Sequence, residues 1–161
     1  MEAVDIAVMY RSLTDTRMCD LAATWDDLVV VLSDHRETQD KFSGPLWSPV
    51  VVKAEGPRRR CNAAVAAVSA IVLDIDDGTP LDVIVAELTG DWIAYSTWNH
   101  TADQPRYHVV VRLASPVAAE DWRKTYGELH GNRADWLPAV SHAYFLPEHR
   151  RGAPWFVRRS S

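Results

Sequence analysis

An apolar segment that ends in acidic residues runs Ser69-Ala70-Ile71-Val72-Leu73-Asp74-Ile75-Asp76-Asp77-Gly78-Thr79. Its β-branched and aliphatic residues, from Ser69 to Ile75, predict a strand. Because side chains alternate along a strand, Asp74 and Asp76 share one face with Val72, whereas the other face is wholly aliphatic. We expect the aliphatic face to pack on helices and the acidic face to remain available for a site.

The segments that follow predict a β-α-β-β-α-β order. A helix is expected over 80–88, strands over 92–97 and 107–113, a helix over 116–130, and a short strand over 143–146. This order is that of ferredoxin-like and RRM-like domains, in which both helices cover one face of the sheet. We therefore predict an α+β fold whose core spans residues 69–147.

The first 68 residues predict an N-terminal α/β part that packs on this core. A strand is expected over 4–10, and Thr24 suits the N-cap of a helix that ends near Ser33. A polar loop then leads to a short strand from Val50 to Lys53. Residues 148–161 are expected to form a basic tail, and the 161 residues together fit a single domain.

Charged residues of the third core strand are expected to meet the acidic pair. Arg106 and His108 fall on one face of that strand, and the first and third strands are central in this topology. Two carboxylates two residues apart repel each other unless a cation lies between them. An alternative is that Asp76 and Asp77 only open a turn. We favour metal binding, because Asp74 lies within the apolar run, where an unpaired charge is costly.

Composition limits the classes of protein that fit this chain. The 17 Lys and Arg against 22 Asp and Glu give a net charge of −5, which excludes nucleic-acid binding by bulk charge. Any polyanion site must be local, and the run Arg58-Arg59-Arg60 is either a solvated surface or such a site. Cys19 and Cys61 are too few for a disulfide framework or a cysteine-based zinc site. Without a long apolar segment or a signal peptide, we expect a soluble, cytoplasmic protein and no membrane partner.

Three motifs in this order resemble the archaeo-eukaryotic primase superfamily, in particular the primase-polymerase domains of phage and plasmid replication proteins. The resemblance covers residues 4–154. The strand that ends in Asp-x-Asp is matched by Asp74 and Asp76, and the Ser/Thr and His motif by Thr97 to His100. The third acidic residue is matched by Asp135.

The resemblance implies a DNA primase or DNA polymerase that transfers nucleotides with Mg²⁺ or Mn²⁺. It implies that the metal is held by the catalytic carboxylates Asp74, Asp76 and Asp135. The nucleoside triphosphate would be bound by His100, Arg106, His108 and Thr97. Template or primer phosphates would be contacted by Lys53, Arg58, Arg59 and Arg60.

The implied partners are a single-stranded DNA template, nucleoside triphosphates and a fused or cognate helicase in a bacterial host cell. The chain is then expected to be the N-terminal part of a longer, helicase-containing protein. Two alternatives stay open. A metal-dependent nuclease or phosphohydrolase would use the same carboxylates to activate water. An RRM-like module would bind single strands without catalysis, although such modules need aromatic side chains on their central strands.

Overall fold

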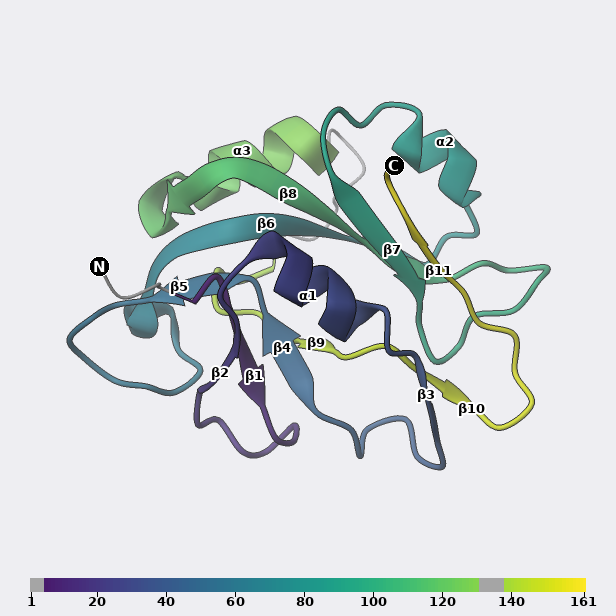
Figure 1. Cartoon of the computed structure of the whole chain (residues 1–161), viewed down its shortest axis with the longest axis horizontal. Helices are drawn as coiled ribbons and strands as arrows, with labels where there is room; N and C mark the ends of the chain where they lie inside the picture. The colour runs from purple at the N-terminus through teal and green to yellow at the C-terminus, as the bar shows by residue number, and fades with distance from the viewer. Residues whose placement is uncertain (1–4, 131–137) are drawn as a thin grey trace.

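The structure is a computed structural model that describes residues 5–130 and 138–161 (Figure 1). Its largest sheet has the strand order β11-β7-β8-β6-β5, and every neighbouring pair in it is antiparallel. These strands are β5 (Val50–Val52), β6 (Val65–Ile75), β7 (Trp92–Ser96), β8 (Tyr107–Ala118) and β11 (Val157–Arg159). The α+β class predicted from the sequence is confirmed.

Two smaller sheets lie beside the largest one. The first of these sheets is antiparallel and has the strand order β2-β1-β4-β9. Its strands are β1 (Ala7–Tyr10), β2 (Cys19–Ala22), β4 (Leu46–Ser48) and β9 (Tyr144–Phe145). The second is a parallel pair formed by β3 (Arg36–Thr38) and β10 (Glu148–Arg150). Residues 148–161, expected as a basic tail, therefore carry β10 and the edge strand β11.

Three of the four predicted core strands have the expected arrangement. Strand β8 pairs with both β6 and β7, so β6 and β7 run parallel on either side of it. The expected fourth strand is different, because β9 pairs with β4 in the second sheet and β5 takes the place beside β6. Strand β6 begins at Val65, before its predicted start at Ser69. The additional residues at its beginning pair with the three consecutive valines of β5. The complete ferredoxin-like sheet is therefore not formed.

Helix α1 matches the predicted bounds, whereas α2 and α3 are shorter than the sequence suggests. Helix α1 (Trp25–Leu32) begins at its predicted cap, where Thr24 Oγ1 accepts a hydrogen bond of 3.1 Å from the Asp27 N–H. Helix α2 spans Leu81–Val85. Helix α3 spans Trp122–His130, because β8 continues through 116–118, where Val117 pairs with Val68. No helix in the described ranges is both long and apolar enough to cross a membrane.

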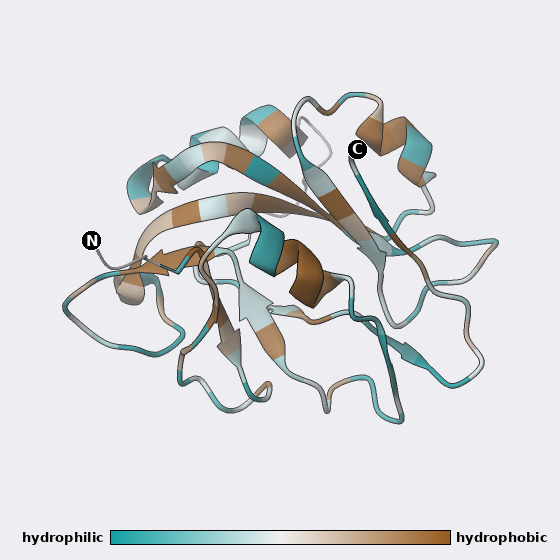
Figure 2. Ribbon diagram, in the orientation of Figure 1, coloured by the Kyte–Doolittle hydropathy of each residue, from teal (hydrophilic) through white to brown (hydrophobic). Residues whose placement is uncertain are grey.

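The predicted alternation along β6 is confirmed. Leu73 and Ile75 belong to the core cluster formed with α2 and α3, whereas Val72 packs on the other side with residues of α1 and β4. Helices α1 and α3 accordingly lie on opposite sides of the central strands (Figure 1), and hydrophobic residues follow α1 and these strands (Figure 2). The sheet face expected to be open is thus covered by the N-terminal part along most of its length. It is accessible at the Asp74 end.

Candidate functional site

A cleft of about 200 Å³ opens at the Asp74 end of the central strands. It is bordered by five residues that the sequence predicts for the site, namely Asp74, Asp76, Thr97, Arg106 and His108. Lys41 and Glu148, which the sequence interpretation did not include, also border it. The cleft therefore brings acidic and basic side chains from distant parts of the chain to one place.

The end of β6 presents the acidic pair. Asp74 lies opposite His108 in the β6–β8 register, and Asp76 follows the last residue of the strand. The turn itself is built by Asp77, whose Oδ1 accepts hydrogen bonds from the N–H and the hydroxyl of Thr79 at 3.0 and 2.7 Å. Gly78 continues this turn with φ +84°, a backbone conformation that favours glycine. Since Asp77 serves the turn, Asp76 is available to the cleft.

The Asp74 carboxylate is held by a histidine. His108 Nε2 lies 3.3 Å from Asp74 Oδ1. Burial raises the pKa of Asp74, but the His108 hydrogen bond and the charges of His108, His142 and Arg106 outweigh it and hold this pKa below its usual value. Asp74 therefore stays ionised in the cleft at neutral pH, which a cation ligand requires.

The predicted triphosphate ligands divide into two groups. Arg106 and Thr97 border the cleft and are paired through a backbone hydrogen bond of 3.0 Å from Thr97 N–H to the Arg106 carbonyl. His108 also borders the cleft, but it is 8% exposed and contacts Asp74 and the Tyr95 hydroxyl. His108 therefore lies against Asp74, and its contact with a triphosphate stays a prediction.

His100 is not among the residues that border the cleft. The His100 N–H donates to the Thr97 carbonyl at 3.0 Å, and this turn directs the His100 ring inward, against Phe156. There His100 Nδ1 accepts a hydrogen bond of 3.1 Å from the Arg106 N–H, and burial lowers its pKa. In this structure the His100 ring supports the β7–β8 connection, and its role in triphosphate binding stays a prediction.

The basic run lies away from the cleft, against the loop between β1 and β2. The Met18 N–H donates to the Arg58 carbonyl, and Arg58 also forms an ion pair of 2.9 Å with Asp20. The Arg60 guanidinium donates to the Leu13 carbonyl at 3.1 Å.

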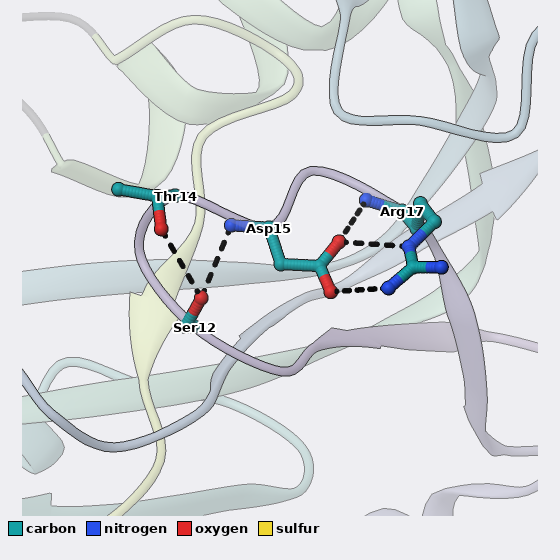
Figure 3. Close-up of polar contacts among 4 residues, drawn as sticks. All are labelled: Ser12, Thr14, Asp15 and Arg17. Carbon is teal, nitrogen blue, oxygen red and sulfur yellow. Dashed lines mark hydrogen bonds and ion pairs between the residues drawn. The ribbon is translucent and has the colours of Figure 1, made fainter.

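The facing loop has its own ion pair, in which Asp15 accepts from the backbone and guanidinium N–H groups of Arg17 (Figure 3). Of the four residues predicted to contact nucleic acid, Arg58 and Arg60 are thus paired within the protein. The side chains of Lys53 and Arg59 have no partner within the described residues.

The third predicted metal ligand, Asp135, lies outside the described residues. Glu148 provides a carboxylate that the sequence interpretation missed. It is only 6% exposed, and its Oε1 has no hydrogen-bond partner among the described residues, while Thr38 Oγ1 lies 3.5 Å from Oε2. Burial raises the pKa of Glu148 to about 7. Gly44 lies so close to Oε2 that a Cβ at this position would clash with the carboxylate.

The carboxylate oxygens at the cleft suit a hard divalent cation rather than a soft one. Within the described residues, no three His, Cys, Asp or Glu side chains are close enough together to hold a metal ion. Asp74, Asp76 and Glu148 nevertheless border one cleft, and a carboxylate oxygen of Glu148 is unpartnered. Mg²⁺ and Mn²⁺ prefer oxygen ligands, and Mg²⁺ usually keeps several waters.

Comparison with protein-family models, with curated proteins and with solved structures finds no match to this chain. The residues of the cleft are therefore the basis for a functional assignment.

Proposed function

We propose that this chain is a metal-dependent nucleotidyltransferase of the primase-polymerase type, which copies a single-stranded DNA template from nucleoside triphosphates. The observation that carries the proposal is the composition of the cleft. Asp74 and Asp76, which suit a divalent cation, border the same space as Lys41 and Arg106, which suit a phosphate chain. Nucleotidyl transfer needs both kinds of group around one substrate.

The carboxylates hold the cation. A bound divalent cation supplies Lewis acidity, which lowers the pKa of an attacking 3′-hydroxyl and offsets the charge that grows on the phosphates. Asp74 and Asp76 provide two of its ligands, and the third carboxylate that the resemblance implies is Asp135. Glu148 borders the same cleft, but in this structure it is not close enough to the aspartates to form a three-carboxylate site with them.

The basic residues hold the triphosphate. Arg106 is positioned by the backbone of the β7–β8 connection, and its charge is close enough to contribute to the lowered pKa of Asp74. A guanidinium can donate two parallel hydrogen bonds to phosphate oxygens, and an ammonium such as that of Lys41 acts as a point charge. Thr97 adds a hydroxyl on the same border. Triphosphate binding is thus assigned to Arg106, Lys41 and Thr97.

The fold supports this proposal at the level of strand order. The acidic pair ends β6, a central strand that is flanked by β8, and β7 lies on the far side of β8. This is the part of the primase-polymerase arrangement on which the Asp-x-Asp motif is found. An RRM-like binding module is disfavoured, because the face that such a module offers to single strands is buried under α1 and β4.

Primer extension on a primed single strand tests the proposal. Asp74→Asn with Asp76→Asn removes two negative charges from the cleft, and we expect loss of nucleotide incorporation in Mg²⁺ and in Mn²⁺. Asp77→Asn is the matched control, because it removes a neighbouring charge that serves the turn. The control variant should retain incorporation.

Two outcomes would overturn the proposal. Undiminished incorporation by the double variant would show that these carboxylates are not catalytic. Degradation of the strand without incorporation by the wild-type protein would assign the same carboxylates to a nuclease, which activates water and has no need of a triphosphate site.

A further inference from the structure

A buried chain of hydrogen bonds leads from the N-terminal sheet to the Asp74 carboxylate. Trp47 Nε1 donates to the Tyr95 hydroxyl at 3.0 Å, and this hydroxyl lies 3.0 Å from His108 Nδ1. His108 Nε2 lies 3.3 Å from Asp74 Oδ1. Trp47 is 0%, Tyr95 1% and His108 8% exposed. The chain crosses from β4 through β7 and β8 to the end of β6, so it connects two sheets to the cleft.

The chemistry of the two ends fixes the direction of the hydrogen bonds. The indole of Trp47 can only donate, and the ionised carboxylate of Asp74 can only accept. The proton on His108 must therefore be at Nε2, facing Asp74. In neutral His108, Nδ1 then accepts from the Tyr95 hydroxyl.

A charged His108 is accommodated by the same groups. Its Nδ1–H would donate to the Tyr95 oxygen, and the Tyr95 hydroxyl would turn to the Phe145 carbonyl, which lies 3.3 Å away. Every polar atom of the chain is paired in both states. The contact between His108 Nε2–H and Asp74 is thus the same whether or not Nδ1 carries a proton.

We propose that Tyr95, supported by Trp47, is a positioning residue for the metal site. Tyr95 holds the His108 ring through Nδ1 so that Nε2–H faces Asp74, and His108 then fixes Asp74 Oδ1 so that the carboxylate faces the cleft in one orientation. The inference rests on the proposed function for the cation, and it gives His108 a role in carboxylate orientation instead of triphosphate contact. Residues that orient metal ligands in this way typically change metal affinity by about 10–100-fold when they are substituted.

Tyr95→Phe tests the proposal, because it removes one oxygen and keeps the buried ring. We expect Mn²⁺ to bind about tenfold more weakly, at the lower end of the range for residues that support a ligand, since Tyr95 acts through His108. Primer extension should need more Mn²⁺ for half-maximal rate and reach nearly the same rate at saturation. Tyr144→Phe is the control, because the Tyr144 ring also contacts His108 edge-on, with centroids 5.3 Å apart, and its hydroxyl has no hydrogen bond to His108.

Nitrogen-15 NMR of His108 provides a readout that does not depend on catalysis. In the wild-type protein, Nε2 should have the pyrrole-type shift of a protonated nitrogen. Tyr95→Phe should shift the Nδ1 resonance, because Nδ1 loses its hydrogen bond, while Nε2 stays protonated opposite Asp74; Tyr144→Phe should change neither nitrogen. If Tyr95→Phe does not fold, His108→Gln and His108→Phe replace it. Gln keeps an N–H donor near the Nε2 position and should retain more Mn²⁺ affinity than Phe.

The outcomes separate this proposal from the proposed function. Weaker Mn²⁺ binding by Tyr95→Phe, in a protein that never incorporates nucleotides, would support the positioning role and overturn the polymerase assignment. Unchanged Mn²⁺ affinity in Tyr95→Phe, with active incorporation by the wild type, would overturn the positioning role alone. A proton on Nδ1 of wild-type His108 in place of Nε2 would also overturn it. A wild-type protein that binds no Mn²⁺ would overturn both.

Discussion

Replacement of Glu148 by Gln tests the assignment of a buried carboxylate to the cleft. Glu148 is 6% exposed, with Oε1 unpaired among the described residues, and burial raises its pKa from 4.5 to about 7. Gln has nearly the same shape and no charge. The substitution therefore removes the cost of burying the charge and leaves the packing against Gly44 nearly unchanged.

The size of the effect follows from the two pKa values. A tenfold change in proton affinity corresponds to about 1.4 kcal/mol, so the difference between 4.5 and about 7 corresponds to about 3 kcal/mol of unfolding free energy. Because the folded-state pKa is the higher one, the wild-type protein loses this stability as pH rises from 4.5 through 7. In metal-free protein, Glu148→Gln should be about 3 kcal/mol more stable than wild type at pH 8 and nearly equal to it at pH 4.5.

Urea unfolding of both proteins across this pH range, with and without Mn²⁺, measures the difference. Mn²⁺ should stabilise both proteins, since Asp74 and Asp76 are present in each. Glu37→Gln, on the neighbouring strand β3, is the control and should follow the wild-type profile, because Glu37 is exposed. A stability difference between Glu148→Gln and wild type that is independent of pH would refute the reasoning.

Three further predictions concern the walls of the cleft and the basic run. Gly44→Ala should lower stability, because its Cβ would clash with the buried Glu148 carboxylate, and urea unfolding measures the effect. Arg106→Ala should weaken binding of a nucleoside triphosphate by about 1.5–3 kcal/mol for each charge-assisted hydrogen bond lost, while Mn²⁺ binding is retained; calorimetric titration of each ligand separates the two. Arg59→Ser should reduce the salt dependence of single-strand binding by nearly one phosphate contact, measured by fluorescence anisotropy at several salt concentrations. Arg58→Ser should change it less, because Arg58 is paired with Asp20.

Local patterns in the sequence were sufficient for several parts of the fold. Thr24 is an N-cap because its hydroxyl reaches a backbone N–H within the same turn, an interaction that neighbouring residues alone determine. The alternation of Leu73, Asp74 and Ile75 similarly depends only on the period of a strand. The sequence therefore predicts that the acidic pair and Arg106 lie near one another, and in the structure they border one cleft.

Features that depend on distant partners were missed. Strand β9 was expected beside β6, but that edge is occupied by β5, a pairing between residues far apart in sequence. Glu148 was assigned to a basic tail because its immediate neighbours include arginines, and only the parallel pairing of β10 with β3 brings it to the cleft. His100 fits a sequence motif, but the turn from Thr97 directs its ring inward. Sequence spacing does not determine such orientations.

The central claim is that one cleft holds a divalent cation and a nucleoside triphosphate. Its most direct test is a crystal structure with Mn²⁺ and a non-hydrolysable deoxynucleoside triphosphate, in which anomalous scattering locates the metal. We predict that Mn²⁺ is bound by Asp74 and Asp76, with the phosphate chain directed toward Arg106. Mn²⁺ bound away from both aspartates, or a nucleotide bound without contact to Arg106 and the metal, would contradict the claim.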